Sequence, residues 1–314
     1  MARDALRFLV ITGQTGSGKE RVALAVAERL GGEIISLDSM KVYRGMGVGT
    51  AKPSAADRRR VPHHLLDVAD PRESFSAARW VELADAALAE IAGRGRVPIV
   101  SGGTLLYLKA LLYGLFDGPG ADAGVRARLR AEAVSAGSAA LHERLARVDL
   151  AAAQRIHPND LRRVVRALEV HELTGRPISE QQAQFGRVRP GLDPLLVALR
   201  RTRDDLHRRI EQRVDRMVAG GLEAEVRRLL ALPGGLSREA AQAVGYREMI
   251  DLIQGRLSPG EAVERTARST RTFARRQMTH LRSLQGLVWL DVAPHEPADE
   301  TAERLVRLWD GHVS

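Results

Sequence analysis

The chain has 314 residues, of which 44% are hydrophobic and 28% are charged, as in ordinary globular proteins. It has no cysteine, which excludes disulfides, thiol nucleophiles and cysteine-based zinc sites. A formal net charge of +9 favours a polyanionic partner such as nucleic acid, although solvated arginine-rich helices explain it equally well. No leader-like segment or apolar run of 18 residues occurs, so we expect a cytoplasmic protein with no membrane partner.

Apolar runs and helical spacing alternate along the chain and predict strands and helices in turn. The expected elements, in chain order, are strand 7–12, helix 18–30, strand 33–38, helix 76–92, strand 97–103, helix 104–114, helical periods over 122–185, strand 193–200, helical segments 203–232 and 259–285 with a shorter one between, and strand 287–292. The order predicts an α/β fold. We expect a P-loop nucleotide-kinase-like core with a parallel sheet and helices on both faces, plus a mostly helical insertion. The core would comprise 1–116 and 191–314, and the insertion 117–190.

Residues 13–20, GQTGSGKE, nearly match a Walker A phosphate loop, G-x-x-x-x-G-K-[ST], between a predicted strand and a predicted helix. Such glycines let backbone N–H groups converge on an anion at the positive end of the helix, and Lys19 adds a point charge. The alternative is a glycine-rich turn with no ligand. The candidate phosphate-binding residues are Gly13, Gln14, Thr15, Gly16, Ser17, Gly18, Lys19 and Glu20.

Glu20 occupies the place where a Ser or Thr hydroxyl normally coordinates Mg²⁺. A carboxylate can ligate Mg²⁺, but it also brings negative charge close to the phosphates. Alternatively, Glu20 pairs with Arg21 or Arg44. Glu20 is thus a candidate metal ligand, and its presence argues against ordinary phosphoryl transfer.

Asp38 ends the second predicted strand, at the edge where ligands of open α/β sheets bind. A carboxylate at this place can accept a proton or hold a metal ion. The alternative is an aspartate that caps the next turn, as Asp-Ser pairs often do. Local sequence leaves both interpretations open.

Longer blocks of the chain resemble the tRNA isopentenyltransferase (tRNA dimethylallyltransferase) family of the bacterial type. They occur in the family's order over nearly the whole chain. The blocks are GQTGSGK, ISLDSMKVYRGMGVGTAKP, PHHLLDV (62–68), FSAARW (75–80), SGGTLLYLKAL (101–111), RIHPNDLRRVVRALEV (155–170), IEQRVDRMVAGGLEAEV (210–226), AVGYREM (243–249) and TRTFARRQMTHLR (270–282).

The resemblance implies transfer of a dimethylallyl group from dimethylallyl diphosphate to N6 of adenine 37, next to the tRNA anticodon. The phosphate loop and Lys19 would then hold the diphosphate, with Mg²⁺ as the implied cofactor. Asp38 would be the general base that accepts the proton of the adenine amine. Thr104 would lie close to the reacting carbon and the departing diphosphate. The adenine must leave its stack to react, so such enzymes flip the base.

The resemblance also implies contacts with the tRNA anticodon stem-loop. The implied contact residues are Asp38, Ser39, Met40, Lys41, Thr104, Asp160, Leu161, Arg162, Arg163, Val164, Gln242, Ala243, Val244, Gly245, Tyr246 and Arg247. Further arginines would widen the basic surface, although charged runs are common on solvated helices. They are Arg126, Arg128, Arg130, Arg162, Arg163 and Arg166 in the insertion, and Arg208, Arg209, Arg213, Arg247, Arg271, Arg275, Arg276 and Arg282 near the C-terminus.

Some positions depart from the family's usual pattern. They are Gln14, Gly16 and Glu20 in the phosphate loop, Gly47 in place of an aspartate, and Gln242 in place of an arginine. The histidines His63, His64 and His157 lie in family-like blocks, and we expect them to be structural or to contact RNA because no zinc spacing is present.

Three other functions stay open: an adenylate isopentenyltransferase, a small-molecule P-loop kinase and a non-catalytic RNA-binding protein. The predicted insertion and the net charge of +9 argue against the first. Glu20 and the lack of a recognisable adenine-binding lid argue against the second. The presence of Lys19, Asp38 and Thr104 argues against the third. Because tRNA is a large ligand, we expect the protein to act as a monomer.

Overall fold

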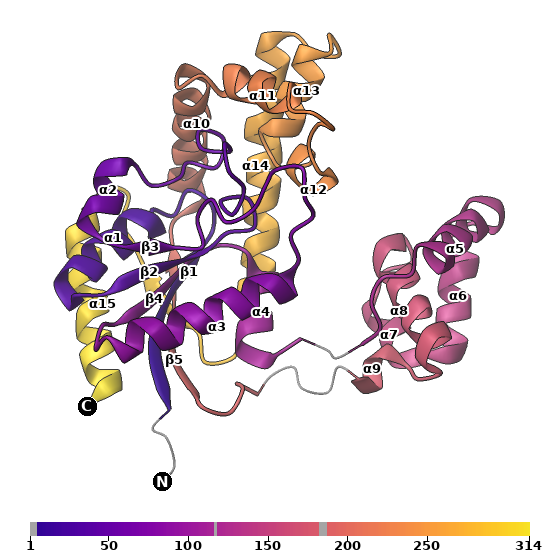
Figure 1. Cartoon of the computed structure of the whole chain (residues 1–314), viewed down its shortest axis with the longest axis horizontal. Coiled ribbons are helices and arrows are strands. Elements are labelled where there is room, and N and C mark those ends of the chain that lie inside the picture. The colour runs from indigo at the N-terminus through magenta and orange to yellow at the C-terminus, as the bar shows by residue number, and fades with distance from the viewer. Residues whose placement is uncertain (1–4, 116–117, 182–186) are drawn as a thin grey trace. The chain divides into compact units, whose positions relative to one another are not determined.

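The computed structural model describes residues 5–115, 118–181 and 187–314, and in these ranges six parallel strands form one sheet (Figure 1). The strand order is β3-β2-β4-β1-β5-β6. The strands are β1 (Leu6–Gly13), β2 (Glu33–Leu37), β3 (His63–His64), β4 (Pro98–Gly102), β5 (Leu192–Arg200) and β6 (Val288–Asp291). The parallel sheet, with helices between its strands, confirms the predicted fold class.

The chain divides into two compact units, Met1–Leu112 with Val188–Ser314, and Tyr113–Arg187. The sheet and most helices belong to the first unit. Its helices are α1 (Lys19–Leu30), α2 (Ala55–Arg60), α3 (Ala77–Gly93), α4 (Leu105–Tyr113, which ends at the start of the second unit), α10 (Arg203–Ala219), α11 (Leu222–Leu230), α12 (Arg238–Ala241), α13 (Tyr246–Ile253), α14 (Pro259–Leu281) and α15 (Ala298–Val313). The sequence did not lead us to predict α2, β3 or α15.

Helices cover both faces of the sheet because its buried strands are apolar on both sides. Leu9 and Ile11 of β1 pack with α1 and α15, where Trp309 joins the same cluster. The alternate strand residues point to the opposite face, against which α3 packs. There Trp80 of α3 stacks on Tyr107 of α4, with ring centroids 5.1 Å apart.

The long helical segment predicted over 203–232 is two helices, α10 and α11. The break falls at Gly220 and Gly221, and Gly221 has φ 86°, in the left-handed region where glycine is favoured. By contrast, α14 runs unbroken for 23 residues and begins with strong local signals. Ser258 and Glu261 form a capping box, and Pro259 occupies the first turn.

The second unit is a helical bundle with its own core. Its helices are α5 (Ala123–Ala136), α6 (Ser138–Val148), α7 (Leu150–Arg155), α8 (Leu161–Thr174) and α9 (Ile178–Gln181). Leu129, Leu145 and Val164 are fully buried in this core. The predicted boundary at 116 and 117, and the end of the segment predicted over 122–185, lie outside the described residues. Among the described helices of both units, none is long and apolar enough to cross a membrane.

Candidate active site at the carboxyl edge of the sheet

Three predicted site residues follow three strands of the sheet. Lys19 comes after β1, Asp38 after β2 and Thr104 after β4. Because β2 and β1 both pair with β4 in parallel, their carboxyl ends meet at one edge. Thr104 joins two of these loops, since its hydroxyl accepts a hydrogen bond from Ser39 N (3.0 Å) and its own N–H donates to Leu37 O (3.2 Å).

The phosphate loop has the backbone geometry that its glycines permit. Gly16 and Gly18 have φ of 91° and 92°, a conformation that side chains rarely adopt. A Cβ at Gly13 would lie only 2.8 Å from Leu199 O on the neighbouring strand β5. The loop ends at Lys19, whose ammonium is 3.4 Å from Gln14 O.

The loop presents a buried cation and a buried hydroxyl without a partner. Burial lowers the pKa of Lys19 to about 8, an effect that outweighs the opposing charge of Glu20. The hydroxyl of Ser17 has no hydrogen-bond partner among the described residues. An unsatisfied buried donor of this kind is the sort of group that a bound anion satisfies.

Helix α14 fixes the phosphate loop from one side through Gln277 and Ala274. Gln277 Oε1 accepts a hydrogen bond from Thr15 N (2.8 Å), and Gln277 Nε2 donates to Gly103 O (2.9 Å). Gln14, one of the departures from the family pattern, donates to Ala274 O (2.9 Å). Gln277 thus connects the loop after β1 to the loop after β4. It lies in the block TRTFARRQMTHLR, but no sequence signal singled it out.

Two arginines hold the loop from the other side. Arg201 donates to Ser17 O (2.7 Å), and Arg209 donates to Gly16 O (2.8 Å). Arg201 also pairs with the buried Asp205 at 3.0 Å. The expectation that Arg209 belongs to an RNA-binding surface is therefore not supported by its contacts, because its guanidinium bonds a loop carbonyl.

The Asp38 carboxylate caps a turn and keeps one oxygen unpaired. Its Oδ1 accepts hydrogen bonds from Met40 N (2.8 Å) and Lys41 N (3.2 Å). Its Oδ2 has no hydrogen-bond partner among the residues that the structure describes. The two interpretations of Asp38 are thus compatible, since a capped turn orients the carboxylate and leaves an oxygen that can accept a proton.

Glu20 pairs with Lys41, and the predicted pairing with Arg21 or Arg44 is wrong. Lys41 Nζ lies 2.6 Å from Glu20 Oε1. Burial alone would raise the pKa of Glu20, but Lys41 and then Lys19 hold it below its usual value. Arg44 instead donates to Asp67 O (3.5 Å) and lies 3.8 Å from the Asp70 carboxylate.

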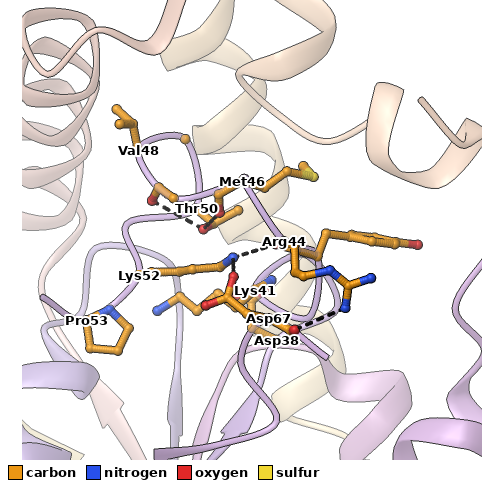
Figure 2. A network of polar contacts seen from close by, with 12 residues as sticks. Asp38, Lys41, Arg44, Met46, Val48, Thr50, Lys52, Pro53 and Asp67 are labelled. Atoms are coloured by element: carbon orange, nitrogen blue, oxygen red, sulfur yellow. Dashed lines mark hydrogen bonds and ion pairs between the residues drawn. The ribbon is translucent and has the colours of Figure 1, made fainter. Parts of the chain in front are cut away.

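The segment after Asp38 is held by a second buried lysine (Figure 2). Lys52 Nζ donates to Tyr43 O (2.5 Å) and pairs with Asp67 at 2.6 Å. Asp67 has φ 58°, a left-handed conformation that is uncommon outside glycine. The Lys52–Asp67 pair therefore connects the GTAKP block to the PHHLLDV block.

A buried carboxylate anchors the adjoining loop 47–49. Glu225 accepts hydrogen bonds from the backbone N–H groups of Gly47 (2.9 Å), Val48 (2.8 Å) and Gly49 (3.1 Å), and from the hydroxyl of Tyr246 (2.6 Å). A Cβ on Gly49 would lie 2.5 Å from the Tyr246 ring. Gly47, the departure from the usual aspartate, still supplies the N–H that this anchor needs.

The structure divides the predicted RNA-contact residues into exposed and buried ones. Arg162 and Arg163 in the second unit, and Gln242 and Arg247 in the first, are exposed. Asp160 has a structural role, since its side chain caps the start of α8 by accepting a hydrogen bond from Arg163 N. The predicted contacts that are buried cannot meet RNA, and they are the side chains of Lys41, Val164, Ala243 and Tyr246.

Several of the predicted basic residues are committed to ion pairs. In the second unit the fully buried Glu169 pairs with Arg126 (2.8 Å) and Arg166 (2.7 Å), and Glu172 pairs with Arg128. In the first unit Arg208 pairs with Asp205, Arg213 donates to Thr50 O, Arg247 pairs with Glu248, and Arg271 pairs with Glu211. Among the predicted basic residues, those that are exposed and whose guanidinium groups have no hydrogen-bond or ion-pair partner among the described residues are Arg130, Arg162, Arg275, Arg276 and Arg282.

The histidines have structural contacts, as expected. His64 bonds the buried Glu33 at 2.7 Å, His63 bonds Val61 O at 2.8 Å, and His157 accepts from Asn159 N at 3.1 Å. No group of three or more His, Cys, Asp or Glu side chains among the described residues could hold a metal ion.

The parallel sheet, the glycine-rich loop after β1 and the carboxylate after β2 define an α/β protein with a candidate ligand site at the carboxyl edge of its sheet. Residues 41–284 match the family model described as IPP transferase. The tRNA dimethylallyltransferase of Anaeromyxobacter sp. strain Fw109-5 is 50% identical over 95% of this chain and 98% of its own length. That of Pelotomaculum thermopropionicum is 44% identical over 97% and 96%. The chain belongs to the IPP transferase family, which confirms the predicted family.

Solved structures agree with this assignment. The full-length tRNA isopentenylpyrophosphate transferase of Bacillus halodurans has a TM-score of 0.71 and 38% identity, covering 98% of this chain and 96% of that one. A eukaryotic dimethylallyltransferase, captured in crystallographic snapshots while acting on tRNA, has a TM-score of 0.81 and 26% identity, covering 98% and 79%. The likeness therefore extends over both units of the chain.

Proposed function

We propose that this protein transfers the dimethylallyl group of dimethylallyl diphosphate to N6 of adenine 37 in the tRNA anticodon loop, with release of diphosphate. One observation carries the proposal. The phosphate loop, Asp38 and Thr104 meet at one edge of the sheet, where Thr104 ties the Asp38 loop to β4. The names of its relatives point to the same reaction.

In this reaction a bond forms between N6 and the allylic carbon, and the bond from that carbon to the diphosphate oxygen breaks. The amine loses a proton, which Asp38 accepts through its unpaired Oδ2. Negative charge grows on the departing diphosphate, where the loop amides and Lys19 stabilise it. The roles of Lys19, Asp38 and Thr104 are supported by their shared place and by the hydrogen bonds that orient them.

The residues at the loop do not fit direct ligation of Mg²⁺ in the usual P-loop manner. The hydroxyl ligand is replaced by Glu20, whose carboxylate is already paired with Lys41. We propose that any Mg²⁺ accompanying the diphosphate is bound by phosphate oxygens and water, which Mg²⁺ tends to retain. No step of the reaction is assigned to the ion.

We propose tRNA as the macromolecular partner, bound by the monomeric protein in the cytoplasm. Support comes from the excess positive charge and from exposed arginines in both units, such as Arg162 and Arg276. The second unit would serve as the tRNA-binding insertion. Its own hydrophobic core makes it a stable platform for such contacts.

One experiment tests the proposal against its competitors. The protein is incubated with dimethylallyl diphosphate, Mg²⁺ and either unmodified tRNA or AMP, and the products are analysed by mass spectrometry. We expect an N6-prenyl adduct on tRNA and none on AMP. Product on AMP alone would establish the adenylate enzyme instead. ATP consumption without either product would indicate a kinase, and tRNA binding without turnover would indicate an RNA-binding protein.

A further inference from the structure

Lysine is rare in this chain and is concentrated at the candidate site. Only four of the 48 basic residues are lysines, and the rest are arginines. Three of the four are Lys19, Lys41 and Lys52, which follow strands at the carboxyl edge of the sheet and have side chains that are almost wholly covered. An ammonium is a compact point charge, whereas a guanidinium is a wide planar fork. The compact ammonium of lysine therefore suits these three covered positions better than the wide guanidinium of arginine.

The three buried lysines have different partners. Lys52 bonds a backbone carbonyl and Asp67, so its charge is used within its own loop. Lys19 is the phosphate-loop lysine. The resemblance implies that Lys41 contacts tRNA, but its side chain is only 5% exposed and it pairs with Glu20 of the phosphate loop, which fits a contact inside the site and not with RNA.

Both ends of the Lys41–Glu20 pair are held in place. The backbone of Lys41 donates to Asp38 Oδ1 (3.2 Å), and its carbonyl accepts from Asp67 N (3.2 Å). Glu20 lies in the first turn of α1, directly after Lys19. The pair therefore places an ammonium beside residue 20, the position whose hydroxyl in an ordinary phosphate loop holds the metal ion.

The charges around this position favour a bound anion. Lys41, Lys19 and Arg213 all act on the Glu20 carboxylate, and Asp38 is the other carboxylate that acts on Lys19. Three cations thus face two carboxylates. Although 40% of the Glu20 side chain is exposed, Lys41 is almost wholly buried, and a buried charge is costly unless it is well paired. Lys41 has that partner in Glu20, and a diphosphate would offset the one positive charge by which the three cations exceed the two carboxylates.

We propose that Lys41, positioned by Glu20, binds the diphosphate in place of the metal ion that a hydroxyl at residue 20 would hold. The proposal rests on the proposed function and specifies how its leaving group is held. Lys41 would contact the diphosphate itself, and Glu20 would act through Lys41 as a positioning residue. Diphosphate binding in this chain then needs little or no Mg²⁺.

The test measures the affinity for inorganic pyrophosphate by isothermal titration calorimetry, in Mg²⁺ and in EDTA. For the wild type we expect the two affinities to agree within about threefold. Lys41→Met should weaken binding about tenfold or more in EDTA, the usual scale for loss of one charged contact, and Mg²⁺ should recover part of that loss. The double variant E20T/K41M restores the usual hydroxyl, so its binding should become Mg²⁺-dependent.

Lys109→Met is the matched control. Lys109 lies on α4, where its ammonium bonds Ser283 Oγ on the surface, so the variant removes one positive charge elsewhere. We expect its pyrophosphate affinity to equal that of the wild type. Melting temperatures measured for every variant identify losses of affinity that come from misfolding. Glu20→Thr removes the partner of Lys41, so we expect it to weaken pyrophosphate binding in EDTA.

The outcomes separate this proposal from the proposed function. If wild-type binding required Mg²⁺, or if Lys41→Met bound like Lys109→Met in EDTA, the role of Lys41 would be refuted while prenyl transfer stood. A purely structural pair would lower affinity equally with and without Mg²⁺ and reduce the melting temperature, which also counts against the proposal. Failure of the wild type to bind pyrophosphate under any condition would refute both.

Discussion

The hydroxyl of Tyr246 donates a hydrogen bond of 2.6 Å to Glu225, the same buried carboxylate that receives the backbone N–H groups of residues 47–49. Helices α11 and α13 are thereby tied to a loop far away in sequence. Burial and the neighbouring carboxylate raise the pKa of Tyr246 well above its usual range, so the tyrosine stays a donor. The loop that follows Asp38 therefore depends on one satisfied carboxylate.

Tyr246→Phe should destabilise the protein by about 1.5–3 kcal/mol, the usual contribution of a hydrogen bond to a charged group. Urea unfolding measures the difference. The control is Tyr107→Phe, because the Tyr107 hydroxyl has no hydrogen-bond partner among the described residues and its ring still stacks on Trp80. Equal stability of the two variants would show that the Tyr246 hydroxyl contributes nothing.

Asp38→Asn and Asp38→Ala should separate the two tasks of Asp38. Asparagine keeps a carbonyl that can accept from Met40 N and Lys41 N, but it cannot accept a proton. Both variants should lower the prenylation rate at saturating substrates by about 10²–10⁴-fold, the usual contribution of a general base. Only Asp38→Ala should also lower the melting temperature, because it alone removes the turn cap. Full activity in Asp38→Asn would exclude a role as the base.

The fold was predictable where a pattern is local. Apolar runs ending at Gly13 and Asp38 mark strands because buried parallel strands need no alternation. The helix α15 was missed because its apolar residues make sense only against β5, β6 and α1, where Trp309 packs. The split at Gly221 was missed because a helical period continues across it.

The site residues were predictable where a motif or the end of a strand marks them, but their contacts with other loops were not. Motifs indicated Lys19, Asp38 and Thr104, whose places follow directly from the ends of strands. Sequence could not show that Glu20 meets Lys41, since that contact depends on how two loops approach each other. It also could not separate arginines that face solvent from those, such as Arg126, that satisfy a buried carboxylate.

The pKa of Lys19 predicts how pyrophosphate affinity changes with pH. Lys19 has a pKa of about 8 in the free protein, and a bound anion favours its charged form. Binding above pH 8 therefore requires proton uptake, so the affinity should fall about tenfold between pH 7 and pH 9. Calorimetric titrations across this range measure the effect.

Lys19→Met is the control for that titration. Its pH profile records the ionisation of pyrophosphate and of the other groups, so the difference between the two profiles belongs to Lys19. The free energy of unfolding of the free protein should change in the opposite direction. The unfolded chain binds the Lys19 proton more tightly than the folded protein, so this group adds stability as the pH rises from 8 to 10.5. Parallel profiles for wild type and variant would contradict the lowered pKa.

Gln277→Leu should weaken diphosphate binding without touching the ligand. The change removes the acceptor of the part-buried Thr15 N and the donor to Gly103 O, and it leaves the buried Gly103 O without its partner. We expect a higher KM for dimethylallyl diphosphate, a smaller change in KM for tRNA, and a lower melting temperature. Gln277→Glu keeps an acceptor for Thr15 N but adds a negative charge beside the phosphate loop. We expect its KM for dimethylallyl diphosphate to exceed that of Gln277→Leu, and a comparison of the two KM values tests this.

Two arginines of the second unit should respond in opposite ways to substitution. Arg162 is exposed and its guanidinium has no hydrogen-bond or ion-pair partner among the described residues, whereas Arg126 bonds the fully buried Glu169. Arg162→Ala should weaken tRNA binding, reduce the slope of log affinity against log salt by about one phosphate contact, and leave the melting temperature unchanged. Arg126→Ala should lower the melting temperature, because it removes a charged partner of Glu169 that contributes about 1.5–3 kcal/mol. Filter binding at several salt concentrations, together with thermal melts, measures both effects. A changed melting temperature in Arg162→Ala, or an unchanged salt slope, would mean that this exposed arginine is not part of the RNA-binding surface.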